Sequence, residues 1–146
     1  LTLGVGYAIF NGDFQSSIHF MNCLILGIPL GLLTTNILLI NEFPDMNSDA
    51  KTGKNHLVVT FGKKSSRWIY LIFLMLAVGS SFYMYQELNN IYLLIPTIFC
   101  FAFGLYIFKH ILTHYELRSL VDANWKTIGL QAIYSIIVCI CLIFGF

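Results

Sequence analysis

Charged side chains are scarce in this sequence. Asp, Glu, Lys and Arg make up 10% of its 146 residues, whereas 58% are hydrophobic, and the mean hydropathy is +0.78. Soluble globular domains contain about 25% charged residues. The shortage therefore excludes an ordinary soluble domain and predicts an integral membrane protein surrounded by a lipid bilayer. A net charge of +1 also gives no reason to expect nucleic acid as a partner.

The cysteines of this sequence are not expected to form disulfides or to react. All four cysteines lie inside apolar runs, where a thiol behaves as a small buried hydrophobic group and a disulfide is not expected. They are Cys23, Cys100, Cys139 and Cys141. We therefore interpret them as packing residues.

The N-terminal apolar stretch 1–10 lacks a basic segment ahead of it, so it does not have the pattern of a signal peptide. It is also shorter than the roughly 20 residues that a helix needs to cross a bilayer. Because the chain begins at Leu1 rather than Met, we expect this stretch to be the tail of a truncated helix. On this interpretation, residues 1–146 are a fragment of a larger bundle.

Four longer apolar runs can each cross a membrane as a helix. They cover approximately residues 20–40, 68–86, 91–108 and 127–146. Ser65 and Ser66 are candidate N-caps for the second of them. The sequence thus predicts an all-α fold, a polytopic transmembrane helix bundle with one partial and four complete spans.

The positive charges are confined to two connections between these runs. All eight Lys and Arg residues lie in 41–67 and 109–126, and none lies in the turn 87–90. A hairpin of two spans separates the two basic connections, so both lie on one side of the membrane. The positive-inside rule makes that side cytoplasmic. We therefore expect a cytoplasmic loop at 41–67.

The most polar stretch of the chain is 41–54. Asn41, Asp45 and Asp49 are four residues apart, so they would share one face if the preceding helix continued for about two turns. Two ionised carboxylates held close together repel unless a cation lies between them. Mg²⁺ is the natural partner, because it takes one or two carboxylates plus the oxygens of a phosphorylated substrate. Lys51 and Lys54 follow closely and could meet the remaining charge of a diphosphate.

Two other interpretations fit parts of this stretch. Asp45, Asn47 and Asp49 match the first ligand positions of an EF-hand loop. That loop needs Gly at its sixth position and Glu at its twelfth, where this chain has Ala50 and His56, so we discard it. A solvated connector whose acidic residues merely balance its lysines remains open.

The histidines give weaker signals. His110 and His114 are one helical turn apart and could bind a metal as a pair. No third ligand stands at a suitable spacing, so an interfacial pair without a metal is favoured. His19 and His56 are isolated in the sequence.

The polar stretch also contains a recognisable sequence motif. It reads Asn41-x-x-x-Asp45-x-x-x-Asp49-x-x-x-Gly53-Lys54, followed by Leu57-Val58-Val59 and Gly62. This run resembles the second aspartate-rich motif of the UbiA-type intramembrane prenyltransferases. Its residues are most similar to the motif of the branch that prenylates 1,4-dihydroxy-2-naphthoate. One departure is that His56 stands where the family usually has Thr.

The resemblance implies transfer of a polyprenyl group from polyprenyl diphosphate to an aromatic acceptor, 1,4-dihydroxy-2-naphthoate in menaquinone biosynthesis. Other acceptors in the family, such as 4-hydroxybenzoate or a haem, are alternatives. Asp45 and Asp49 would be the catalytic residues that hold Mg²⁺ on the diphosphate. Asn41, Lys51 and Lys54 would bind the substrate.

The resemblance further implies that residues 1–146 are the C-terminal part of one prenyltransferase domain in the bacterial inner (cytoplasmic) membrane. The missing N-terminal half would carry a first motif, Asn-Asp-x-x-Asp-x-x-x-Asp, and this chain alone would be inactive. The alternative from another class is a non-enzymatic four-span membrane protein or a transporter. Transporters commonly show internal repeats, and none is found here.

The charge distribution generates a topology prediction. Single cysteines placed at Ser48 and Ser119, on a background without the four native cysteines, should react with a membrane-impermeant reagent from the cytoplasmic side. A cysteine at Asn89 should react only from the opposite side. Labelling in intact and in opened cells distinguishes the two. Reaction of positions 48 and 89 from the same side would refute the predicted orientation.

Overall fold

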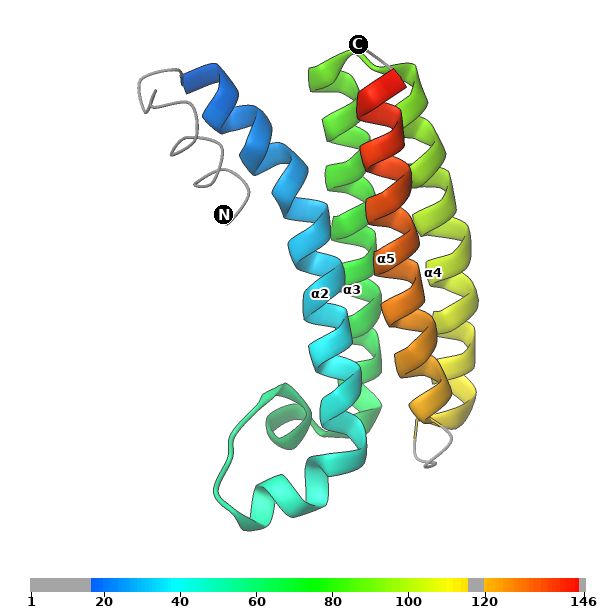
Figure 1. The fold of residues 1–146 in the computed structure, drawn as a ribbon. Helices are drawn as coiled ribbons and strands as arrows, with labels where there is room; N and C mark the ends of the chain where they lie inside the picture. The colour runs from blue at the N-terminus through cyan, green and yellow to red at the C-terminus, as the bar shows by residue number, and fades with distance from the viewer. Residues whose placement is uncertain (1–16, 116–119, 145–146) are drawn as a thin grey trace.

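The computed structural model of the protein describes residues 17–115 and 120–144. They form α2 (Ser17–Lys51), α3 (Leu57–Leu88), the short 3-10 helix η1 (Ile91–Leu93), α4 (Leu94–His114) and α5 (Val121–Phe144), with no strand in either range. In Figure 1, α3, α4 and α5 stand side by side, while the upper part of α2 leans away from them. The predicted all-α fold is confirmed. The expected partial span at 1–10 lies outside the described residues.

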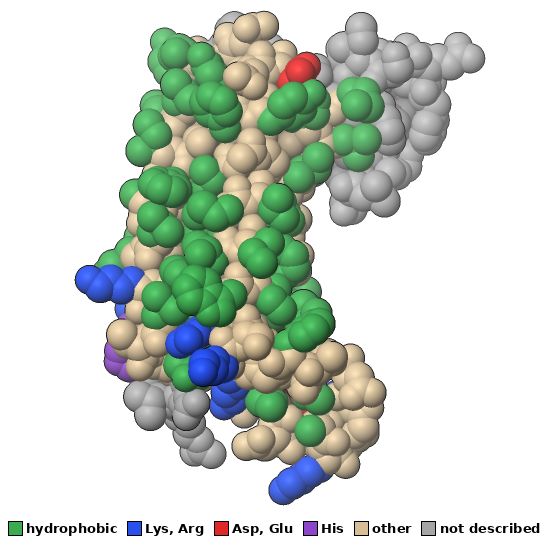
Figure 2. Space-filling model, turned by 180° about the vertical axis from the view of Figure 1, so that it is seen from behind, with side chains coloured by type: hydrophobic (Ala, Val, Ile, Leu, Met, Phe, Trp, Pro, Cys, Tyr) green, Lys and Arg blue, Asp and Glu red, His purple; other side chains and the backbone are tan. Residues whose placement is uncertain are grey.

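Each of the four long helices is long and apolar enough to cross a membrane. Many of their large hydrophobic side chains are exposed. Figure 2 shows such side chains along the length of one face of the molecule, with Lys and Arg side chains toward its lower end. This surface matches lipid tails, which are as apolar as the side chains themselves. The fold is therefore that of a multi-pass integral membrane protein.

Hydroxyl groups buried among α3, α4 and α5 bond to one another. Tyr134 Oη donates to Ser81 Oγ at 2.8 Å, and Ser81 Oγ lies 2.7 Å from Thr97 Oγ1. In a second buried pair, Tyr70 Oη lies 3.2 Å from Thr127 Oγ1. Interhelical hydrogen bonds in a membrane contribute about 0.6 kcal/mol each. They therefore determine which helix faces meet more than they add to stability.

Helix α4 packs tightly against α3 at Gly104. A Cβ atom at this position would overlap the methyl groups of Leu74, a fully buried residue of α3. Only glycine allows the two helices to approach this closely without displacing Leu74, which is the usual role of small residues in membrane bundles.

Helix α2 bends near its end. Pro44 lies inside the helix. It has no N–H to donate to the carbonyl of Ile40, and its ring crowds that carbonyl. Figure 1 shows the last turns of α2 turned away from the axis of its membrane part. Asn41 therefore precedes the bend, whereas Asp45 and Asp49 follow it.

The segment 41–67, expected to be a loop, is mostly helical. Helix α2 continues to Lys51, residues 52–56 make the connection, and α3 begins at Leu57. Gly62 interrupts α3 with φ 75° and ψ 158°, so 57–61 is a short helical segment of its own. The loop expectation is wrong because polar composition marks where a helix leaves the membrane, not where it ends.

The N-cap candidates Ser65 and Ser66 lie inside α3. Ser66 Oγ donates to the carbonyl of Gly62 at 2.9 Å and caps no helix. The N-cap of α3 is instead His56, whose Nδ1 accepts the N–H of Val59 at 3.3 Å. An apolar run therefore predicts a membrane helix well but predicts its first residue poorly.

Replacing Gly104 with leucine should destabilise the bundle by about 1–3 kcal/mol, the usual cost of overpacking, because the new side chain would displace Leu74. Gly79 on α3 is a matched control, since nothing lies within 4 Å of a Cβ placed there. In detergent, Gly104→Leu should lower the Tm by several degrees, and Gly79→Leu should not lower it. Equal melting temperatures of the two variants would contradict the close packing.

Candidate functional site

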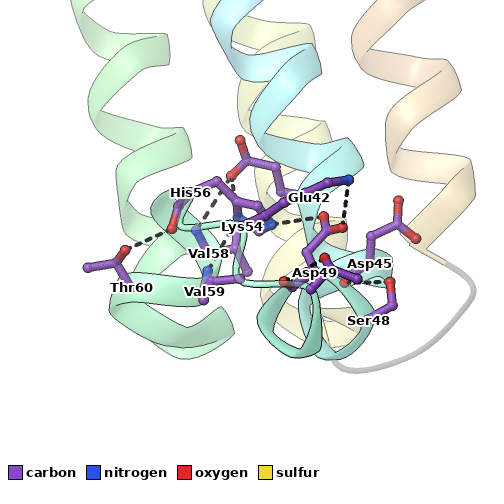
Figure 3. A network of polar contacts seen from close by, with 10 residues as sticks. Glu42, Asp45, Ser48, Asp49, Lys54, His56, Val58, Val59 and Thr60 are labelled. Atoms are coloured by element: carbon purple, nitrogen blue, oxygen red, sulfur yellow. Dashed lines mark hydrogen bonds and ion pairs between the residues drawn. The ribbon is translucent and has the colours of Figure 1, made fainter.

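Polar side chains from three consecutive segments meet at the lower end of the bundle. Figure 3 shows Glu42 and Asp49 from α2, Lys54 from the connection 52–56, and His56, the N-cap of α3, directed toward one another. We call these four residues the charged cluster. They lie beyond the apolar parts of the helices that carry them.

The chain reverses its direction at the C-terminus of α2, and this reversal places Lys54 beside the helix that precedes it. Gly53 has φ 77°, a left-handed conformation that glycine adopts most readily. Lys54 N–H donates to the carbonyl of Asp49 at 3.0 Å, and Gly53 N–H donates to that of Ala50 at 3.3 Å. This is the Schellman pattern of a helix C-terminus. The chain therefore reverses within a few residues, and Lys54 lies beside Asp49.

Both oxygens of the Asp49 carboxylate have partners. Oδ1 lies 3.1 Å from Lys54 Nζ, and Oδ2 lies 3.1 Å from His56 Nε2. The Lys54 side chain is 69% exposed, and an ion pair in water is worth at most about 1 kcal/mol. The His56 side chain is only 17% exposed. Lys54 can therefore leave Asp49 easily, whereas His56 is the more persistent partner.

Glu42 is a member of the charged cluster that was not singled out in the sequence. Its Oε2 lies 3.1 Å from His56 Nδ1 and 3.5 Å from the backbone nitrogen of Val58. Glu42 and Asp49 stand two turns apart on α2, so their side chains share a face. That spacing is the signal that could have identified Glu42.

The expectation that His56 is isolated is wrong. Its imidazole ring lies between the carboxylates of Glu42 and Asp49 (Figure 3). Neither carboxylate is a helical neighbour of His56 in the sequence. Only the chain reversal at Gly53 brings residue 56 back along α2, and this reversal is hard to infer from spacing.

Asp45 stands one turn before Asp49 on the last segment of α2. Its side chain is exposed, and Figure 3 shows its carboxylate directed away from His56 and Lys54. No ion pair joins it to another residue in the ranges 17–115 and 120–144. Two carboxylates therefore stand on neighbouring turns, and among the described residues only that of Asp49 lies beside basic side chains.

Asn41 and Lys51 are not bonded to the charged cluster. Asn41 precedes the bend in α2, and Lys51 is the last residue of that helix. Both side chains are exposed, and neither forms a hydrogen bond or ion pair with the part of the chain that the structure describes. Of the five residues predicted for the site, the structure thus joins only Asp49 and Lys54 directly.

The oxygen ligands of the site suit a hard divalent cation. Mg²⁺ is typically bound by one or two carboxylates, and waters and substrate phosphates fill its other positions. Asp45 and Asp49 offer such carboxylates, and both are accessible to solvent. Among the described residues, no three His, Cys, Asp or Glu side chains form a metal site. The residues therefore fit a Mg²⁺ ion that keeps its waters or is shared with a phosphorylated substrate.

The fold and the site define a multi-pass membrane protein with a carboxylate-rich, lysine-containing cluster at one end of its helices. The chain belongs to the UbiA prenyltransferase family, whose model matches residues 2–128. Comparisons with curated proteins and with solved structures gave no match. The family resemblance seen in the motif is confirmed, and it extends well beyond the motif itself. The family is one of membrane prenyltransferases that act on prenyl diphosphates and aromatic acceptors.

Proposed function

We propose that this protein transfers a polyprenyl group from polyprenyl diphosphate to 1,4-dihydroxy-2-naphthoate in menaquinone biosynthesis, in the bacterial inner (cytoplasmic) membrane. Membership of the UbiA prenyltransferase family supports prenyl transfer. The residues of the motif around Asp45 support 1,4-dihydroxy-2-naphthoate as the acceptor. One observation carries the proposal. Asp45 and Asp49 are accessible carboxylates on neighbouring turns, and the Lys54 ammonium lies 3.1 Å from Asp49.

The reaction breaks the bond between the allylic carbon and the diphosphate oxygen, and the electron pair leaves with the diphosphate. The electron-rich ring of the acceptor then supplies the pair for the new carbon–carbon bond, and the same ring carbon loses its proton, or a carboxyl group as carbon dioxide, to restore the aromatic ring. Mg²⁺ held by Asp45 and Asp49 would supply positive charge to the leaving group. Lys54 would release Asp49 and bind another diphosphate oxygen. Lys51 and Asn41, exposed nearby on α2, would contact the same group.

An apolar hollow of about 470 Å³ lies between α2 and α5. Its lining consists of Cys23, Leu26, Leu30, Ser135, Val138, Cys139 and Leu142. A hollow of this composition suits the hydrocarbon tail of the donor.

On this proposal, the charged end of α2 faces the cytoplasm, the side that the distribution of Lys and Arg predicts. A first aspartate-rich motif from another part of the protein would complete the diphosphate site. Two carboxylates hold about one Mg²⁺, so residues 1–146 by themselves would bind diphosphate weakly and transfer no prenyl group.

The acceptor is tested with membranes that contain the full-length protein, a polyprenyl diphosphate and Mg²⁺. We expect prenylation of 1,4-dihydroxy-2-naphthoate and none of 4-hydroxybenzoate or haem, measured by mass spectrometry of the extracted lipids. Membranes without the protein are the control. Transfer to 4-hydroxybenzoate alone would overturn the proposed acceptor while leaving prenyl transfer intact.

Asp45→Asn and Asp49→Asn should each reduce kcat/KM on the order of 100-fold or more, because each removes a carboxylate that would hold Mg²⁺ on the leaving diphosphate. Expression and Tm should change little, because Asp45 is exposed and Asp49→Asn keeps the size and shape of a partly covered side chain. Asp122→Asn is a matched control, because Asp122 is an exposed aspartate in the first turn of α5. If both motif variants kept the activity of Asp122→Asn, the assignment of the site would be wrong.

A further inference from the structure

His56 is the least exposed partner of Asp49 and takes no part in the function proposed above. Its Nε2 lies 3.1 Å from Asp49 Oδ2, and its Nδ1 lies 3.1 Å from Glu42 Oε2. The ring therefore joins two carboxylates that stand two turns apart on α2. It does so from the next helix, because His56 is the N-cap of α3.

The hydrogen bond from His56 to Asp49 forms in each state of the ring in which Nε2 carries a proton. With one proton, on Nε2, that N–H donates to Asp49 Oδ2, and Nδ1 accepts the N–H of Val59 at 3.3 Å. With two protons, Nε2–H still donates to Asp49, and Nδ1–H donates to Glu42. The contact with Asp49 is thus common to both forms, and only the contact with Glu42 depends on the second proton.

The two oxygens of Asp49 are consequently held in different ways. Oδ2 is bound by His56, which is mostly covered and anchored in α3, whereas Oδ1 is bound by Lys54, which is mostly in solvent. A small cation that approaches Asp49 from solvent has to displace only Lys54. The carboxylate would keep its orientation during this exchange, because the contact between His56 and Oδ2 does not involve Lys54.

We propose that His56, supported by Glu42, is a positioning residue that fixes Oδ2 of Asp49 and so presents Oδ1 to a divalent cation in place of Lys54. The proposal rests on the proposed function, in which Asp49 is a metal ligand. Carboxylates that bind metals are commonly held by hydrogen bonds from a second group, and loss of such a partner weakens metal affinity about 10–100-fold.

This arrangement is particular to a histidine at position 56. A threonine, the residue usual at this place in the motif, has one hydroxyl proton to donate and could not donate to Glu42 and Asp49 together. The departure noted in the sequence is therefore the feature that creates the bridge.

Two amide substitutions separate positioning of Asp49 from capping of α3. The amide nitrogen of glutamine can occupy about the place of Nε2, so His56→Gln should keep the hydrogen bond to Asp49. Asparagine is a good N-cap but too short to reach Asp49, so His56→Asn should keep the cap and lose that bond. His114→Ala, on α4, is a control for loss of a histidine elsewhere.

The test titrates the full-length protein in detergent with Mn²⁺, a paramagnetic substitute for Mg²⁺, and measures free Mn²⁺ by electron paramagnetic resonance. We expect His56→Asn to bind Mn²⁺ about 10–100-fold more weakly than the wild type. His56→Gln should bind within a few-fold of the wild type, Glu42→Gln should show a smaller loss than His56→Asn, and His114→Ala should show none. In turnover, His56→Asn should need more Mg²⁺ for half-maximal rate but reach nearly the wild-type kcat at saturating Mg²⁺.

Equal Mn²⁺ affinities of His56→Asn and His56→Gln, whether high or low, would overturn the positioning role and leave the proposed function intact. A fall in kcat that saturating Mg²⁺ does not restore would also overturn it. A wild-type protein that neither binds Mn²⁺ nor transfers a prenyl group would overturn the proposed function, and this inference with it.

Discussion

Lipid cannot form hydrogen bonds with a polypeptide backbone, and the form of this protein follows from that constraint. Every N–H and C=O at membrane depth has to be satisfied within the chain, which favours long helices. Polar side chains inside the bundle bond to one another, as Tyr134 does with Ser81. Charged side chains are displaced to the helix ends. The groups that could bind a diphosphate are therefore found where the helices leave the membrane.

The charged cluster depends on places where helix geometry is broken. Pro44 turns the last part of α2, which carries Asp49, away from the membrane part of that helix. Gly53 ends α2 in a left-handed conformation, and Gly62 separates the first turns of α3 from the rest. Three short interruptions thus bring side chains from consecutive segments into contact. Each occurs at a residue whose backbone properties differ from those of an ordinary L-amino acid.

The helical membrane fold could be predicted from the sequence because it depends on composition and run length, which are local properties. The proximity of Asp49 and Lys54 could also be anticipated, since the two residues lie five apart in one short motif. Predicting the charged stretch as a loop failed because a helix can become polar without ending. Asp45 and Asp49 stand on one helix segment, as their spacing suggested, but their carboxylates have different surroundings.

The contact between His56 and Glu42 could not be predicted from the sequence. Their contact joins the end of one helix to the start of the next, and it depends on the angle at Pro44 and the reversal at Gly53 together. Neither the bend at Pro44 nor the reversal at Gly53 can be inferred from residue spacing. The substitution at position 56 could be noticed in the sequence, but its consequence required the geometry.

The two partners of Asp49 also respond differently to ionic strength. At 0.15 M salt the Debye length is about 8 Å, and exposed charges are screened more strongly than covered ones. Added salt therefore weakens the attraction of the mostly exposed Lys54 for Asp49 before it affects the hydrogen bond from the mostly covered His56. The electrostatic potential at Asp49 thus varies with the surrounding solution, while the place of its carboxylate does not.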